Sequence, residues 1–293
     1  IPHFEKGGLG GIQLLSAPPI ARVYNCNNQA LSLHPKLNTI KPCHYNKTNP
    51  CYALTFTPPP PLQGQNTWLH ALLIVLTLAV GLVVDKLGGV TGQIIVSVAV
   101  WALLMYLLAQ QTPAWRTTLV LALVLVFAIE CLLSLVFGWY DYQFFNIPPF
   151  VPPGHILLFM LGPTIARKLP DVVTTISPII VALYGTFAAL SGWSTFDSAL
   201  AIIFLIAYRY GSSRKTYCIM IVLALALELW GTWLGNWTWR PVTPFTFGLT
   251  TQNPPLLAGA LYACFDMCVM VIARAVHRRH INASQPIYSA QSA

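Results

Sequence analysis

The chain has 293 residues, of which 56% are hydrophobic and only 8% are charged, and its formal net charge is +8. An ordinary soluble domain carries roughly 25% charged residues to cover its surface, whereas helices that face lipid need no polar cover, so this composition excludes a soluble domain. The basic residues recur in short clusters between apolar runs. Such spacing is typical of membrane topology signals and argues against a partnership with nucleic acid.

Residues 1–67 differ from the rest of the chain. They are polar and rich in proline, contain Cys26, Cys43 and Cys51, and end near four consecutive prolines at 58–61 that predict a stiff polyproline spacer. The cysteine spacing matches no standard zinc pattern, so no metal site is predicted. Because so polar a segment has little core of its own, we expect it to lie outside the membrane and to suit contact with a membrane protein partner.

Eight apolar segments follow, and each is a candidate transmembrane helix. A helix needs about 20 residues to cross a bilayer, with a range of about 17–25, so the fourth and sixth segments are short and must be extended or enclosed by neighbours. The segments cover roughly residues 68–88, 91–110, 115–138, 154–166, 173–192, 197–209, 216–236 and 254–276. The prediction is an all-α, polytopic membrane domain at 68–280 with about eight helices, followed by a polar tail at 281–293. A count of about six or seven helices is the alternative.

The basic residues predict the orientation of these helices. Alternate connections and the C-terminal end hold Arg116, Arg167, Lys168, Arg209, Arg214, Lys215, Arg274, Arg278 and Arg279. The other connections hold only Lys86 and Arg240. Because basic loops stay in the cytoplasm, we expect a multi-pass protein with both termini cytoplasmic.

Two halves of the chain resemble each other. The sequence VLVFAIE at 124–130 matches VLALALE at 222–228, an offset of 98 positions. After each Glu come a Gly, an aromatic cluster and then a Pro-Pro pair, Pro152-Pro153 or Pro254-Pro255, which suits the first turn of the next helix. Four helices per half is an even number, so the sequence predicts two parallel four-helix repeats related by an axis along the membrane normal.

Three acidic residues lie within the predicted helices, where a carboxyl group is costly and marks function. Glu130 and Glu228 lie about 12 and 10 Å below the outer ends of their helices, and Asp266 lies about 16 Å down the last helix. Glu228 and Asp266 could therefore approach each other and share a proton. The alternative is that each carboxyl group is simply protonated and bonded to a neighbouring helix.

Other candidate site residues lie near the outer ends of the helices. His155 could relay protons or could be an ordinary interfacial His. The aromatic residues of the two clusters could stabilise a cation or a polyene through their rings, or could form the usual interfacial belt. They are Trp139, Tyr140, Tyr142, Trp237 and Trp239.

The order of an intramembrane acid, Gly-x-aromatic-x-aromatic and a Pro-led helix resembles the integral-membrane lycopene cyclases and carotenoid hydratases. The resemblance covers residues 124–155 and 222–266. It implies a helical enzyme of carotenoid biosynthesis that protonates a polyene without a metal or other cofactor, with Glu130 and Glu228 at the acidic position. Those cyclases carry an acid pair after the proline of the following helix, where this chain has Leu256-Leu257 or Gly154-His155.

Three functions are compatible with this sequence. The first is a membrane enzyme acting on a hydrophobic, isoprenoid-like substrate by acid–base chemistry, with Glu130, Glu228, Asp266 and His155 as catalytic residues. In this hypothesis the substrate is bound by Trp139, Tyr142, Trp237 and Trp239. The second is a non-catalytic subunit of a larger membrane complex held through residues 1–67, and the third is a proton-coupled transporter.

Overall fold

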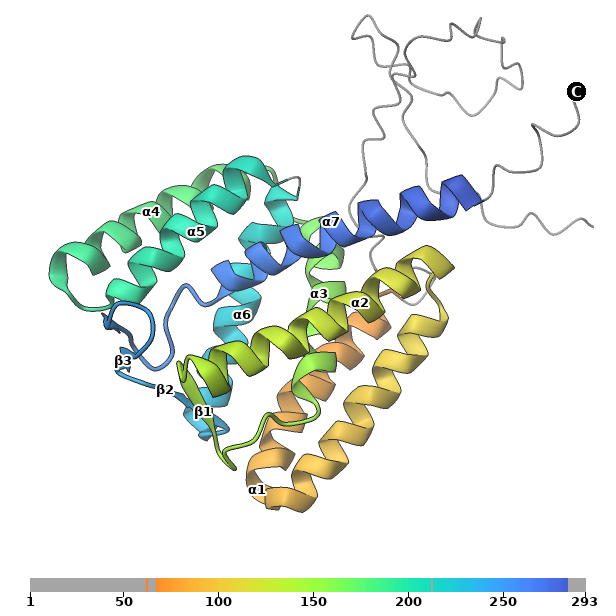
Figure 1. The fold of residues 1–293 in the computed structure, drawn as a ribbon, viewed down its shortest axis with the longest axis horizontal. Helices are drawn as coiled ribbons and strands as arrows, with labels where there is room; N and C mark the ends of the chain where they lie inside the picture. The colour runs from red at the N-terminus through yellow and green to blue at the C-terminus, as the bar shows by residue number, and fades with distance from the viewer. Residues whose placement is uncertain (1–61, 63–66, 212, 284–293) are drawn as a thin grey trace, which may run out of the picture. The chain divides into compact units, whose positions relative to one another are not determined.

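The computed structural model describes residue 62 and residues 67–211 and 213–283, which belong to one compact unit. The predicted N-terminal segment and the predicted tail therefore lie almost entirely outside the described residues. Within them the chain is helical, which confirms the all-α prediction (Figure 1). The helices are α1 (Thr67–Ala109), α2 (Pro113–Glu130), the π-helix η1 (Cys131–Val136), α3 (Val151–Ala166), α4 (Val172–Ser191), α5 (Thr195–Tyr210), α6 (Arg214–Leu234) and α7 (Gly259–Ala283).

Helix α1 consists of two arms that fold back on each other at Gly89. This residue has φ 58° and ψ −142°, a conformation that glycine adopts without steric cost (Figure 1). The arms pack very closely, since a Cβ atom on Gly92 would lie only 2.2 Å from the carbonyl oxygen of Val84. The apolar segments predicted at 68–88 and 91–110 correspond to these two arms.

Four helices form the centre of the unit, and helical hairpins cover it. Helix α2 packs on α3 and α7, while α6 packs on the same two helices, so the four make a ring (Figure 1). The α1 hairpin lies on α3, and the α4–α5 pair lies on α7. Helices α6 and α7 approach each other closely at Gly259, where a Cβ atom would lie 2.5 Å from the Cα atom of Ile221.

Five of the described helices are long and apolar enough to cross a membrane. They are α1, α2 with η1, α4, α6 and the Gly259–Val276 part of α7. Much of their apolar surface points outward, as at Phe127 and Leu183, which is expected of helices that contact lipid. Helix α3 is shorter, and nearly all its residues are buried among its neighbours.

Two short antiparallel sheets lie in the connections between helices. Strand β1 (Tyr140–Tyr142) pairs with β2 (Trp237–Trp239), and β3 (Val242–Thr243) pairs with β4 (Leu249–Thr250). Neither sheet is expected from hydropathy alone. Strands β1 and β2 are formed by the two aromatic clusters, which joins segments almost a hundred residues apart.

The Pro-Pro pairs do not act alike in the two halves. Pro152 and Pro153 lie in the first turn of α3, as predicted. Helix α7 begins only at Gly259, so Pro254 and Pro255 precede it and do not open it. The reason is that the chain after these prolines is held elsewhere, because the N–H groups of the next two residues donate to the carboxylate of Asp197 in α5.

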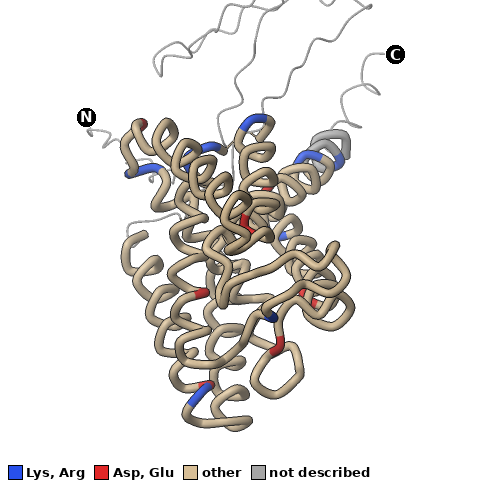
Figure 2. The backbone as a smooth tube through the Cα atoms, turned by 90° about the vertical axis from the view of Figure 1, so that its left-hand side faces the viewer, with Lys and Arg blue, Asp and Glu red and all other residues tan. Residues whose placement is uncertain are grey.

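The charged residues are unevenly distributed along the helices. Figure 2 shows that most of the Lys and Arg residues lie toward one end of the helical unit. Lys86 and Arg240 are apart from this group, bonded to Gly235 and Asp141 beside β1 and β2. The helical unit therefore has one basic end and one end that carries the aromatic sheet.

The close approach at Gly92 provides a test of the α1 hairpin. We expect Gly92→Ala to force the arms apart, at a cost of about 1–3 kcal/mol, and to lower the melting temperature in detergent by about 2–4 °C for each kcal/mol. Gly88→Ala is the matched control, since a Cβ atom there meets nothing within 4 Å. Equal melting temperatures for the two variants would show that the arms are not packed in this way.

Candidate functional site

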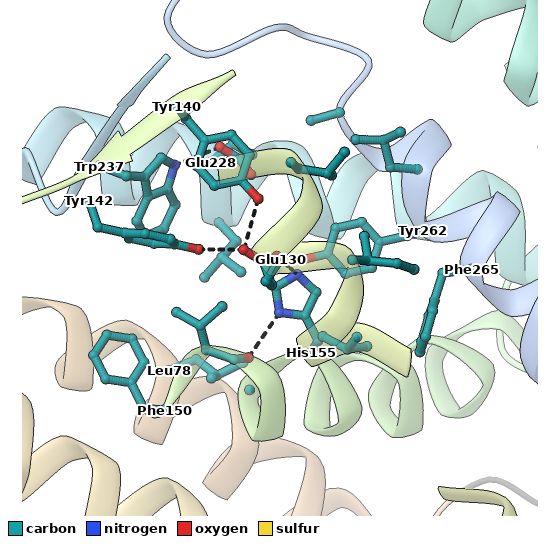
Figure 3. Close-up of a pocket in the computed structure, with 18 of the residues that line it drawn as sticks. Leu78, Glu130, Tyr140, Tyr142, Phe150, His155, Glu228, Trp237, Tyr262 and Phe265 are labelled. Carbon is teal, nitrogen blue, oxygen red and sulfur yellow. Dashed lines mark hydrogen bonds and ion pairs between the residues drawn. The ribbon is translucent and has the colours of Figure 1, made fainter. Parts of the chain in front are cut away.

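A cavity of about 310 Å³ lies among the central helices, beneath the β1–β2 sheet. This volume is at the lower end of the range of about 300–1,000 Å³ typical of small-molecule sites. Most of its lining is apolar, including Leu78, Val100, Val126, Phe150, Leu227, Leu261 and Phe265 (Figure 3). Against this background a few polar groups converge, and they come from α2, α3, α6 and the two strands.

Glu130, at the junction of α2 and η1, is the first of these groups. The hydroxyl groups of Tyr140 and Tyr142 both donate to its Oε2 atom at 2.8 Å (Figure 3). The two tyrosines reach the same atom because alternate residues of a strand point to one face. Burial, and then the charge of Glu130, raise the pKa of both phenols well above the usual value, so they remain protonated donors.

His155, in the first turns of α3, contacts the other oxygen of Glu130. Its Nδ1 atom lies 2.9 Å from the carbonyl oxygen of Val151, which can only accept, so Nδ1 carries a proton. Its Nε2 atom then faces Oε1 of Glu130 at 3.3 Å. A proton at this contact would join the imidazole and the carboxyl group by a hydrogen bond. The ring is also stacked on Tyr262 of α7, with centroids 5.1 Å apart.

Glu228, in α6, is held in a matching way by β2. The indole N–H groups of Trp237 and Trp239 donate to its Oε2 atom at 2.8 and 2.9 Å. The indole of Trp237 can lie against α6 because residue 231 is glycine, where a Cβ atom would come within 2.0 Å of the ring. Glu228, Glu130 and His155 all line the same cavity.

The β1–β2 sheet that carries these donors is fixed on both sides. Its register places Asp141 opposite Thr238, and Arg240 forms a two-pronged ion pair with Asp141 at 2.9 Å. On the inner side, the buried carboxylate of Asp85 accepts from Asn236 at 2.7 Å and from Gln143 at 2.9 Å. These amides flank the two strands, so Asp85 ties the sheet to the α1 hairpin.

The structure brings most of the predicted site residues together. The cavity is lined by Glu130, Glu228, His155, Tyr140, Tyr142, Trp237 and Trp239. Trp139 does not line it, because it precedes the strand and packs edge-on against Phe196, with ring centroids 4.9 Å apart. Among the described residues no cluster of three or more His, Cys, Asp or Glu side chains could hold a metal ion.

Asp266 also lies away from the cavity. It is buried beside Tyr217 of α6, and the acidic residue that lines the cavity together with Glu228 is Glu130. The α7 residues that line the cavity include Phe265, and each step along a helix rotates the side chain by about 100°. That rotation turns Asp266 away from the cavity. The approach of Asp266 to Glu228 was expected from its depth along the helix axis, and depth does not tell in which direction the side chain points.

Two residues of the site are not identified from the sequence. Tyr262 lies in an apolar helix and carries no motif of its own. Asp85 could have been found, because it is an acidic residue within the apolar segment 68–88. It lies near the predicted end of that helix, however, and so resembles a loop residue. Its buried position becomes clear only when α1 folds back at Gly89.

The role of Asp85 can be tested by hydrogen exchange. Asp85→Ala removes the buried carboxylate that accepts from both amides and leaves them only the backbone oxygens of Leu82 and of residue 85, at a cost of about 1–3 kcal/mol. The backbone N–H groups of Gln143 and Arg240, which bond across the sheet, should then exchange at least about tenfold faster. Asp171→Ala is the control, because that side chain is 93% exposed. Unchanged exchange in Asp85→Ala would contradict the anchoring role.

Comparisons of the chain with protein-family models, with curated proteins and with solved structures found no match. The function is therefore inferred from the chemistry of the cavity. Its distinctive feature is a pair of carboxyl groups, each held by two aromatic donors, that face one largely apolar space.

Proposed function

We propose that this protein is an integral-membrane enzyme that acts on a hydrophobic, isoprenoid-like substrate by acid–base chemistry. The observation that carries the proposal is the contact between Nε2 of His155 and Oε1 of Glu130, which lies at an apolar cavity with a second carboxyl group, Glu228, on its wall. An acid and a base that share one apolar cavity are what protonation of an alkene or an alcohol requires.

In the proposed reaction, the Glu130–His155 pair donates its proton to one carbon of a substrate double bond. The π electrons form the new C–H bond, and the neighbouring carbon becomes a carbocation. The rings of Tyr140, Trp237 and Trp239 line the space around it and can stabilise positive charge through their faces. Glu228 then removes a proton from an adjacent carbon, which restores a double bond at a new position.

The return of that proton to the Glu130–His155 pair would complete the cycle without any net change in protons. Glu228 is suited to the base role because its Oε2 atom is fixed by two indole groups, which donate and cannot accept. Trp139 and Asp266 have no part in this scheme, since neither lines the cavity.

We also propose that the membrane domain is an internal repeat of two four-helix units. The α1 hairpin would correspond to α4 and α5, α2 with η1 to α6, and α3 to α7. In support, α2 and α6 each carry a glutamate followed by a strand, and each packs on both α3 and α7. The antiparallel register pairs Asp141 with Thr238, which are equivalent positions in the two halves, as a local two-fold axis would require.

The basic end of the helical unit is proposed to face the cytoplasm. The clustering of Lys and Arg there supports this orientation through the positive-inside rule (Figure 2). The β1–β2 sheet and the cavity beneath it would then lie toward the outer side of the membrane.

The proposed chemistry predicts that both carboxyl groups are needed. Glu130→Gln and Glu228→Gln keep a similar shape and size but remove an acid or a base, so each should lower product formation by at least about a hundredfold. The measurement is a comparison of isoprenoid lipids, by mass spectrometry, in cells that express the wild type or a variant. Asp171→Asn, at an exposed acid, is the matched control. Wild-type lipid profiles in both glutamine variants would exclude the proposed reaction.

A further inference from the structure

The cavity has an exposed margin, and all of it lies on two helices. The most exposed residues of the cavity lining are Leu132 in η1 and Cys264 and Cys268 in α7. The two cysteines are four residues apart, so they lie on one face of the helix. The cavity therefore reaches the surface between α7 and the junction of α2 with η1.

This opening lies within the membrane-crossing part of the molecule. Leu132 belongs to the candidate span Pro113–Val136, and both cysteines belong to the span Gly259–Val276. The exposed surface of these two spans is apolar elsewhere as well, as at Phe127 on α2 and Val271 on α7. None of these side chains carries a charge, so the opening matches hydrocarbon better than water.

The local backbone contributes to the opening. Directly after Glu130 the chain changes from α-helix to π-helix, and the N–H of Phe137 bonds to the carbonyl oxygen of Leu132 at 2.8 Å, five residues back. Such π-helical turns are rare and occur frequently at functional sites. Leu132, in this turn, is exposed, while Glu130 directly before the turn is buried and lines the cavity.

We propose that the substrate enters this cavity sideways from the bilayer, with its hydrocarbon chain passing Leu132, Cys264 and Cys268. The proposal rests on the proposed function, and it adds the substrate class: a lipid-phase molecule with a slender apolar chain. The inner part of the path is lined by Leu133, Leu261 and Phe265. The reactive end of the molecule would then reach Glu130 and Glu228 while the rest of the chain occupies the opening.

The test measures retention of geranylgeraniol by the full chain in phosphatidylcholine nanodiscs, using native mass spectrometry. Leu132→Trp and Cys264→Trp should fill the opening and lower the retained amount at least about tenfold. The matched controls are Leu135→Trp and Val271→Trp, at residues that are 61% and 63% exposed on the same two helices but do not line the cavity. The controls should retain the alcohol as the wild type does.

Three results would overturn the proposal. They are wild-type retention in both opening variants, an equal loss in opening and control variants, and no retention by the wild type. Glu130→Gln separates the entry route from the chemistry, because it should retain the alcohol even where turnover is lost. If the opening variants lose the alcohol and Glu130→Gln keeps full turnover, the opening is supported and the proposed reaction is excluded. If the opening variants keep the alcohol and Glu130→Gln loses turnover, the reaction is supported and the opening is excluded.

A second measurement does not depend on the identity of the ligand. A full chain that keeps Cys264, with its other cysteines replaced by Ala, can carry a nitroxide label at that position. Oxygen, which dissolves in the bilayer, should relax the label more strongly than a water-soluble nickel chelate does. Stronger relaxation by the nickel chelate would show that the opening faces water and would overturn lateral entry.

Discussion

A carboxyl group inside the hydrocarbon layer needs hydrogen-bond donors from the protein, because no bulk water is there to supply them. In this molecule the need is met twice by the same device: the chain that leaves the helix forms a strand, and two alternate aromatic residues of the strand donate to one carboxylate oxygen. The two strands pair with each other. The hydrogen bonding of both Glu130 and Glu228 therefore depends on one small sheet.

That sheet depends in turn on contacts of unequal strength. The ion pair between Asp141 and Arg240 is partly exposed, and exposed ion pairs contribute little, typically about 0–1 kcal/mol. The bonds from Asn236 and Gln143 to Asp85 join the sheet to a fully buried carboxylate, and a buried carboxylate is costly to leave without donors. The α1 hairpin places Asp85 beside the sheet, so its fold is coupled to the geometry of the cavity. This holds although the turn at Gly89 lies far in sequence from Glu130 and Glu228.

Hydropathy was sufficient to locate the helices, because each apolar segment is long enough to show its composition, and the repeated order of Glu, Gly and aromatic residues pointed to Glu130 and Glu228. The strands were not predictable in this way, since three residues are too few to show an alternating pattern. Without the strand, Trp139 and Tyr140 appear equivalent, yet only Tyr140 shares a face with Tyr142. Asp266 illustrates a different limit: its depth can be counted along the helix, but the direction of its side chain depends on how α7 packs.

The two carboxyl sites are alike in geometry but differ in what they can do with a proton. Phenol and imidazole groups can both donate and accept, so Tyr140, Tyr142 and His155 can pass a proton to or from Glu130. Indole N–H groups only donate, so Trp237 and Trp239 can hold Glu228 in place but cannot relay a proton to it. Within the proposed repeat, tyrosine in place of tryptophan at matching strand positions, together with His155 in one half only, would separate the roles. In the proposed reaction, Glu130 would then be the group through which a proton arrives, and Glu228 would be the fixed acceptor.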